Sequence, residues 1–199
     1  MCFHHKPKGK RKTGDVIIDD VAVAKNLTDK EYVKFINDAT EEATKKGMTL
    51  EGYLQEIAEL LSKLKKYKPI KNKFPNEALP KNGKFVNYEI KDGLIILENN
   101  IKTVNSIDYV ITLDGKLLLG KKHHFLGNKL DVFAAGDLKI VNGYIKKLSN
   151  ASGHYFPNIK ESENFSKIFK LMNLNLEKAW METFWEESGR VFNKSLKIN

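Results

Sequence analysis

Cysteine is nearly absent from this chain of 199 residues, whose one cysteine is Cys2. A single thiol excludes a disulfide within the chain and a zinc site built from cysteines. Long apolar runs are also absent, since no stretch approaches the roughly 18 residues that a membrane span requires. The opening MCFHHKPKGKRKTG lacks the apolar centre of a Sec signal peptide. These absences predict a protein that is cytosolic, or that some other carrier delivers into a cytosol.

Charge of one sign is in excess. Lys and Arg number 34 against 25 Asp and Glu, a net charge of +9. Such a balance favours polyanionic surroundings such as RNA, DNA or anionic lipid headgroups. A lysine-rich solvated surface explains the same excess equally well. The hydrophobic share of 41% is enough for one folded domain of ordinary size, with or without a small helical annex.

The N-terminal part of the chain reads as a tail followed by helices. Residues 1–14 predict a flexible basic tail and residues 15–67 a helical region, in which DVIIDDVAVAKN fits strand and helix equally. Thr28 and Glu31 have the spacing of a capping box, and Gly47 ends the helix that they open. A second helix follows, with its apolar face on Leu50, Tyr53, Leu54, Ile57, Leu60, Leu61 and Leu64. The two helices predict a helical hairpin.

Residues 68–83 hold three of the five prolines and predict a linker or an extended crossing. The chain beyond them, residues 84–199, predicts an α+β domain. Three pairs of turn-forming residues stand between apolar runs there, and each predicts a β-hairpin: Asp92-Gly93, Asp114-Gly115 and Asn142-Gly143. The expected architecture is a meandering antiparallel sheet over 84–150, which follows the helical hairpin and carries C-terminal helices packed on it.

Two C-terminal helices are expected. Asn158 can cap the first, with Glu161 three residues on, and its buried face comprises Phe165, Ile168, Phe169 and Met172. A last helix is predicted over 176–188, with three aromatic residues: Trp180, Phe184 and Trp185.

Three of the five histidines fall in two short turns, GKKHHFLGN and NASGHYFPN. The hairpin predicted over 131–150 returns the chain to the same end of the sheet, so the two turns can face one another. Two imidazoles are the usual pair for general base and general acid work, which predicts catalytic roles for His124 and His154. Neighbouring donors and cations complete the candidate site, with Ser152 and Tyr155 in catalytic roles and Lys121, Lys122, Lys129 and Gly153 against the substrate. The set suits metal-independent cleavage of RNA and calls for no cofactor.

Other interpretations of the same residues stay open. His154 and Tyr155 fit equally a tight structural turn that Pro157 stiffens. Zinc is a weaker hypothesis, because the neighbours His123 and His124 point to opposite faces if they lie on a strand. Glu161 and Glu163 resemble the paired acids of ADP-ribosyltransferases, although carboxylates at a helix start also compensate the helix dipole.

One module in the C-terminal half resembles a known family. YVITLDGKLLLGKKHHFLG, AAGDLKIVNGYIKKLSN and SGHYFP, followed by the helical NFSKIFKLMNLNLEKA, are similar to the C-terminal region of plant IQ-motif calmodulin-binding proteins. A similar module stands at the C-termini of bacterial polymorphic toxins and effectors. The likeness covers residues 108–179. The serines that follow the first histidine of the module are absent here, where Phe125 and Leu126 follow His124, and there is no IQ motif.

This resemblance implies a toxin or effector of interbacterial competition. Such a domain is released from a larger delivery protein or secreted by a non-Sec route, acts in the cytosol of a target cell, and can have a cognate immunity protein. The expected activity is that of a metal-independent ribonuclease, with RNA or another polyanion as partner. ADP-ribosyl transfer from NAD is the enzymatic alternative, and a non-enzymatic binding module is the other.

Overall fold

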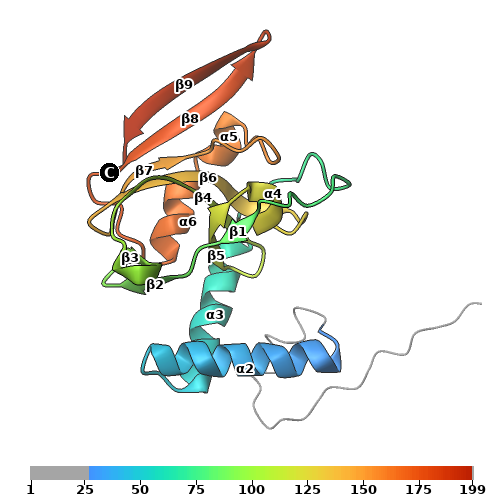
Figure 1. Ribbon diagram of the computed structural model, residues 1–199, viewed down its shortest axis with the longest axis vertical. Coiled ribbons are helices and arrows are strands. Elements are labelled where there is room, and N and C mark those ends of the chain that lie inside the picture. The colour runs from blue at the N-terminus through green and yellow to red at the C-terminus, as the bar shows by residue number, and fades with distance from the viewer. Residues whose placement is uncertain (1–26, 199) are drawn as a thin grey trace, which may run out of the picture. The chain divides into compact units, whose positions relative to one another are not determined.

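The computed structural model describes residues 27–198, which form parts of two compact units that divide between Ser62 and Lys63 (Figure 1). The expected basic tail at 1–14 and the undecided segment before residue 27 lie outside the described residues. The predicted linker, residues 68–83, belongs to the second unit.

The predicted pair of helices is present as α2 (Asp29–Lys45) and α3 (Leu50–Leu64); the first unit contains α2 and all but the last two residues of α3. The capping box at the start of α2 is confirmed. The Glu31 backbone N–H donates to Thr28 Oγ1 at 3.4 Å, and the Thr28 backbone N–H donates to a Glu31 carboxylate oxygen at 2.8 Å. The buried residues of α2 are two small ones, Ala39 and Ala43.

The second unit is built on a seven-stranded sheet whose order is β1-β5-β4-β6-β7-β8-β9. Its strands are β1 (Lys84–Phe85), β4 (Val104–Thr112), β5 (Leu117–Lys121), β6 (Val132–Val141), β7 (Tyr144–Ser149), β8 (Trp180–Glu187) and β9 (Arg190–Lys197). A separate two-stranded sheet pairs β2 (Tyr88–Lys91) with β3 (Leu94–Leu97), and the short 3-10 helix η1 (Glu98–Asn100) follows it.

All three predicted hairpin turns are confirmed. The pairs β2–β3, β4–β5 and β6–β7 are antiparallel and are joined at residues 92–93, 114–115 and 142–143. The order of the strands departs from a simple meander, because β6 pairs with β4 rather than with β5. As a result β4 and β6 lie inside the sheet, and most of their side chains are buried on both faces.

The helix that Asn158 was expected to cap is present as two short segments, α5 (Ile159–Ser162) and α6 (Phe165–Leu171). Asn158 Oδ1 accepts from the Glu161 backbone N–H at 2.9 Å, which confirms the cap. The α6 side chains meet the sheet at Tyr109, whose ring lies edge-on to Phe165 and Phe169 at centroid distances of 6.5 and 5.1 Å. All three rings are fully buried, so α6 and the middle of β4 form the core.

The prediction of a last helix over 176–188 is wrong. Residues 180–187 are strand β8, which pairs in parallel with β7 and antiparallel with β9. The spacing of the aromatic residues at 180, 184 and 185 fits a helical face, but the alternation of a strand accommodates it as well. Ser188 and Gly189 both adopt positive φ and turn the chain into β9, so strand pairing decides the structure of this segment.

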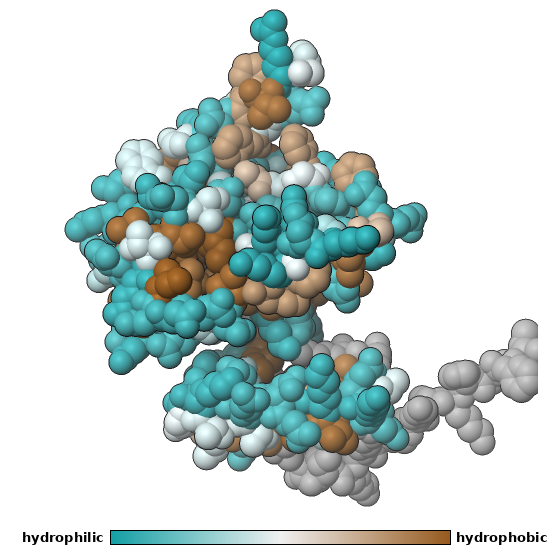
Figure 2. Space-filling view, viewed as in Figure 1, coloured by the Kyte–Doolittle hydropathy of each residue, from teal (hydrophilic) through white to brown (hydrophobic). Residues whose placement is uncertain are grey.

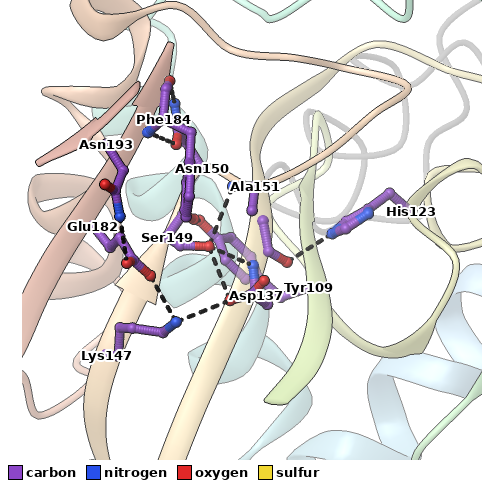
Figure 3. A network of polar contacts seen from close by, with 11 residues as sticks. Tyr109, His123, Asp137, Lys147, Ser149, Asn150, Ala151, Glu182, Phe184 and Asn193 are labelled. Atoms are coloured by element: carbon purple, nitrogen blue, oxygen red, sulfur yellow. Dashed lines mark hydrogen bonds and ion pairs between the residues drawn. The ribbon is translucent and has the colours of Figure 1, made fainter. Parts of the chain in front are cut away.

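A polar network joins β6, β7 and β8 (Figure 3). The parallel pairing of β7 with β8 covers only three residue pairs. Asn150 extends it, since its side-chain amide donates to the Phe184 carbonyl at 2.9 Å and its Oδ1 accepts from the Phe184 N–H at 2.7 Å. Nearby, the Lys147 ammonium lies 2.7 Å from Glu182 and 3.8 Å from Asp137. Side chains therefore strengthen a short parallel junction.

Candidate functional site

Two of the predicted histidines form a stack. His124 lies on α4 (His123–Leu126), the helical turn after β5, and His154 lies in the turn between β7 and α5. Their ring centroids are 4.4 Å apart and the planes are inclined by 17°. The sequence predicts that the two side chains lie on the same side of the sheet, within roughly 10 Å of one another. The distance between the rings confirms that they lie close together.

His124 is the buried member of the stack, with no exposed surface. Its Nδ1 lies 3.2 Å from Asn72 Nδ2, and its Nε2 lies 3.0 Å from the Glu77 carbonyl oxygen. The Asn72 amide has a fixed orientation, because its Oδ1 accepts from the Phe74 N–H at 2.9 Å and its Nδ2 also donates to the Lys129 carbonyl. Nδ1 must therefore accept and Nε2 must donate, which makes His124 a neutral imidazole with its proton on Nε2.

His154 is the accessible member, with 32% of its side chain exposed. Its Nε2 lies 3.1 Å from Oε2 of Glu77, a carboxylate that is itself 56% exposed. The Phe74 ring contacts the imidazole edge-on at 5.8 Å. A carboxylate at Nε2 orients the ring and favours a proton on that nitrogen, and this leaves Nδ1 as the atom that can accept a proton from a ligand.

The segment 70–77 supplies the partners of both histidines. Ile70 bridges to Val132 at the start of β6, with N–H donors on both residues and distances of 2.7 and 3.1 Å. The Asn72 N–H then donates to Asp131, and the Lys73 N–H donates to the His154 carbonyl at 2.9 Å. This stretch is thus an extended crossing, held by backbone bonds, that brings Asn72 and Glu77 to the stack.

Tyr155 anchors the turn that carries His154. Its ring is buried and its hydroxyl donates to the Leu130 carbonyl at 2.8 Å. Burial, and to a smaller extent the charge of Asp131, raises the pKa of the Tyr155 hydroxyl well above its usual value. Gly127 makes room for this hydroxyl, since a Cβ at that position would collide with it. The contacts of Tyr155 therefore fix the backbone of the turn.

Ser152 and Gly153, which precede His154, differ in their surroundings. Ser152 is buried, and its hydroxyl has no hydrogen-bond partner among residues 27–198. Gly153 is exposed, and a Cβ there would meet no atom within 4 Å. Packing therefore does not demand a glycine at 153, where the backbone stands open to a ligand.

The predicted lysines lie at different places around the site. Lys121 and Lys122 are exposed at the end of β5, where Lys121 pairs with Lys84 and the Lys122 N–H donates to Asp108. Lys129 is joined to the stack through its carbonyl, which accepts from Asn72. The lysine in contact with the turn of His154 is Lys73, whose ammonium donates to the Phe156 carbonyl at 3.0 Å and lies 4.8 Å above the Phe156 ring.

His123 belongs to separate surroundings. Its Nε2 lies 2.7 Å from the Gly136 carbonyl (Figure 3). Its Nδ1 lies 3.8 Å from Asp108, so the partners of His123 differ from those of His124. In the described part of the chain, no group of three or more His, Cys, Asp or Glu side chains is arranged to hold a metal ion.

Three site residues are missing from the sequence-based prediction: Asn72, Lys73 and Glu77. All three lie in the proline-rich stretch that predicts a linker or crossing. No spacing rule connects them to residues about fifty to eighty positions away, because only the bridge from Ile70 to Val132 brings them there.

Comparison with known proteins adds no relative, since no family model, curated protein or solved structure matches the chain. Among residues 27–198, no helix is both long and apolar enough to cross a membrane.

Proposed function

We propose that this protein is a cytotoxic effector or polymorphic-toxin domain that cleaves RNA without a metal ion, with His154 as the general base. The observation that carries the proposal is the pair formed by the His154 imidazole and the Glu77 carboxylate, 3.1 Å apart and accessible to solvent. A partly exposed imidazole that a carboxylate orients is suited to proton transfer.

In this mechanism Nδ1 of His154 accepts the proton of a ribose 2′-hydroxyl. The 2′-oxygen attacks the adjacent phosphorus, the bond to the 5′-oxygen breaks, and the leaving oxygen takes a proton from water. The products are a 2′,3′-cyclic phosphate and a free 5′-hydroxyl. Glu77 orients His154 and stabilises the imidazolium, while the Lys73 ammonium, which contacts the same turn at Phe156, compensates charge on the phosphorane.

His124 serves as a positioning residue in this proposal. Both of its ring nitrogens are engaged, and its protonation would set an N–H against the Asn72 amide N–H. Its ring stacks on the ring of His154, and its Nε2–H donates to the backbone carbonyl of Glu77. His124 thus acts through His154 and Glu77, whereas His154 meets the substrate.

Charge supports RNA as the substrate class, since the net charge of +9 favours a polyanion. The alternative, ADP-ribosyl transfer, depends on the acid pair Glu161 and Glu163. The Glu161 carboxylate already accepts from the Asn158 backbone N–H at 2.9 Å as part of the cap of α5, which favours a structural use. The resemblance to toxin and effector modules is the basis for proposing action in the cytosol of a target cell.

The test is incubation of the purified full chain with total RNA in EDTA, compared with the His154→Ala variant. We expect fragments that end in a 2′,3′-cyclic phosphate, and a rate about a hundred to ten thousand times lower for the variant. A Glu161→Gln variant is the control, because it alters a helix cap and should leave the rate unchanged. A parallel incubation with labelled NAD in cell lysate tests the alternative.

Intact RNA with label transferred to a macromolecule would overturn the proposal in favour of ADP-ribosyl transfer. Intact RNA and no transfer would leave a non-enzymatic binding module. Equal RNA cleavage by wild type and His154→Ala would show that the site lies elsewhere.

A further inference from the structure

The two edges of the seven-stranded sheet are built differently. One edge is β1, a strand of only two residues. The other is β9, which has eight residues, all of them exposed. No described strand pairs with the outer side of β9. Alternate residues of such an edge turn their N–H and C=O groups away from the sheet, and proteins commonly shorten, bend or cover an edge of this length.

β9 also exposes apolar side chains. Val191, Leu196 and Phe192 are 65%, 55% and 42% exposed, and the hairpin that carries them projects at the top of Figures 1 and 2. Phe192 stacks on Trp185 of β8 with centroids 5.9 Å apart, so its ring is held in place rather than free to turn. Phe192 and Leu196 therefore present an apolar surface on one face of the strand, beside unpaired backbone groups, and Val191 lies on the other face.

The charges of β9 decide which partner fits. The strand RVFNKSLK holds three basic residues and no acidic one. Because side chains alternate between faces, Arg190 and Lys194 share one face with Phe192 and Leu196. In a second copy of the chain the facing strand would again be β9, which has no acidic side chain to set opposite Arg190 or Lys194. A second copy of this chain is thus a poor partner.

We infer that β9 is a docking edge for an extended acidic segment of a partner protein, which adds an eighth strand to the sheet. Backbone hydrogen bonds to β9 supply the pairing, as in strand addition generally. On one face of the added strand, acidic residues stand opposite Arg190 and Lys194, and apolar residues stand opposite Phe192 and Leu196. This inference is independent of the reaction proposed above, because β9 supplies none of the residues of the histidine site.

The probe for this inference is a labelled peptide, Thr-Val-Thr-Glu-Thr-Val-Thr-Glu, which places valines and glutamates opposite those four residues in antiparallel pairing. We expect saturable binding to the full chain at low salt by fluorescence anisotropy. The same peptide with lysines in place of the glutamates should not bind. Lys194→Glu should weaken binding on the order of tenfold, since it replaces an attraction with a repulsion.

The matched control is Lys167→Glu, the same charge change at an exposed position of α6. It should leave the affinity unchanged, and circular dichroism should show that both variants are folded. Failure of the acidic peptide to bind, or equal binding by the Lys194→Glu and wild-type chains, would overturn the inference. If the chain sediments as a dimer and Lys194→Glu changes the dimerisation, the partner is a second copy and the inference is overturned. If Lys194→Glu weakens the binding of RNA but not of the peptide, the inference is overturned in favour of RNA.

Discussion

The two stacked histidines are one residue type in two settings. His124 is fully buried and both of its ring nitrogens have partners, whereas His154 is about one third exposed and has a carboxylate on one nitrogen. The rings are 4.4 Å apart, so the distance between them does not separate their roles. The hydrogen-bond partners and the burial of each ring distinguish their roles. The buried ring supports the structure, and the accessible ring keeps one nitrogen available for chemistry.

The largest expected effect on stability is at the buried ring. His124→Ala leaves a cavity and removes a partner from Asn72 and from the Glu77 carbonyl, so the free energy of unfolding should fall by about 3 kcal/mol. His154→Ala removes one stacked ring and a solvent-exposed hydrogen bond to Glu77, and should cost only about 1 kcal/mol. Urea denaturation of both variants measures the difference. Equal losses would show that the two histidines are equivalent structural residues.

Next in size is the effect of the carboxylate on activity. Glu77→Gln keeps the shape of the side chain but removes the charge that faces His154 Nε2, so the rate of RNA cleavage should fall about ten- to a hundredfold. Its melting temperature should change little, because the side chain is more than half exposed. The control is Glu163→Gln, an exposed carboxylate at the end of α5, which should cleave RNA at the wild-type rate. A wild-type rate for Glu77→Gln would remove Glu77 from the mechanism.

A smaller effect is expected at Asp131, the carboxylate that accepts from the Asn72 backbone N–H. Burial raises the pKa of Asp131, but the Lys71 ammonium at 2.9 Å and the Asn72 N–H outweigh it and lower the pKa overall. A carboxyl with a lowered pKa in the folded state stabilises the fold above its unfolded pKa of about 4, and this contribution disappears as the pH falls through the folded value. Asp131→Asn should therefore have a lower melting temperature than wild type at pH 6. Its free energy of unfolding should be lower by less than about 1 kcal/mol.

As the pH falls below the unfolded pKa of about 4 and through the lower folded value, the melting temperatures of Asp131→Asn and wild type should converge. A gap that stays constant over this range would show that the charge of Asp131 does not contribute.

The smallest expected effect on stability comes from Gly153, where the backbone is open. Gly153→Ala should leave stability unchanged or raise it by about 0.5 kcal/mol, because alanine restricts the unfolded chain and meets no atom in the folded one. If a substrate approaches the backbone here, RNA cleavage should fall although the melting temperature does not. Unchanged cleavage would exclude close approach at this residue.

Local residues alone determined much of this structure. Asp-Gly and Asn-Gly pairs set three hairpins, because Asp92, Asn142 and the glycine of each pair adopt positive φ at low cost. Thr28 with Glu31, and Asn158 with Glu161, mark helix starts through contacts three residues apart. Ser188-Gly189 is a signal of the same kind, but the helical spacing of the aromatic residues before it obscured the strand. Short-range chemistry of this type depends only on neighbours in the sequence, so it can be read there.

Tertiary structure alone decided the site. The sequence singled out both histidines, but Asn72 and Glu77 reach them only because Ile70 pairs with Val132, more than sixty positions away. The segment that this pairing positions contacts both rings, of which His124 is fully buried and His154 is partly exposed. Long-range pairing between strands also sets their order, in which β6 lies beside β4 and β9 becomes the open edge. Contacts between distant segments depend on the packing of the whole sheet, which no local pattern of residues specifies.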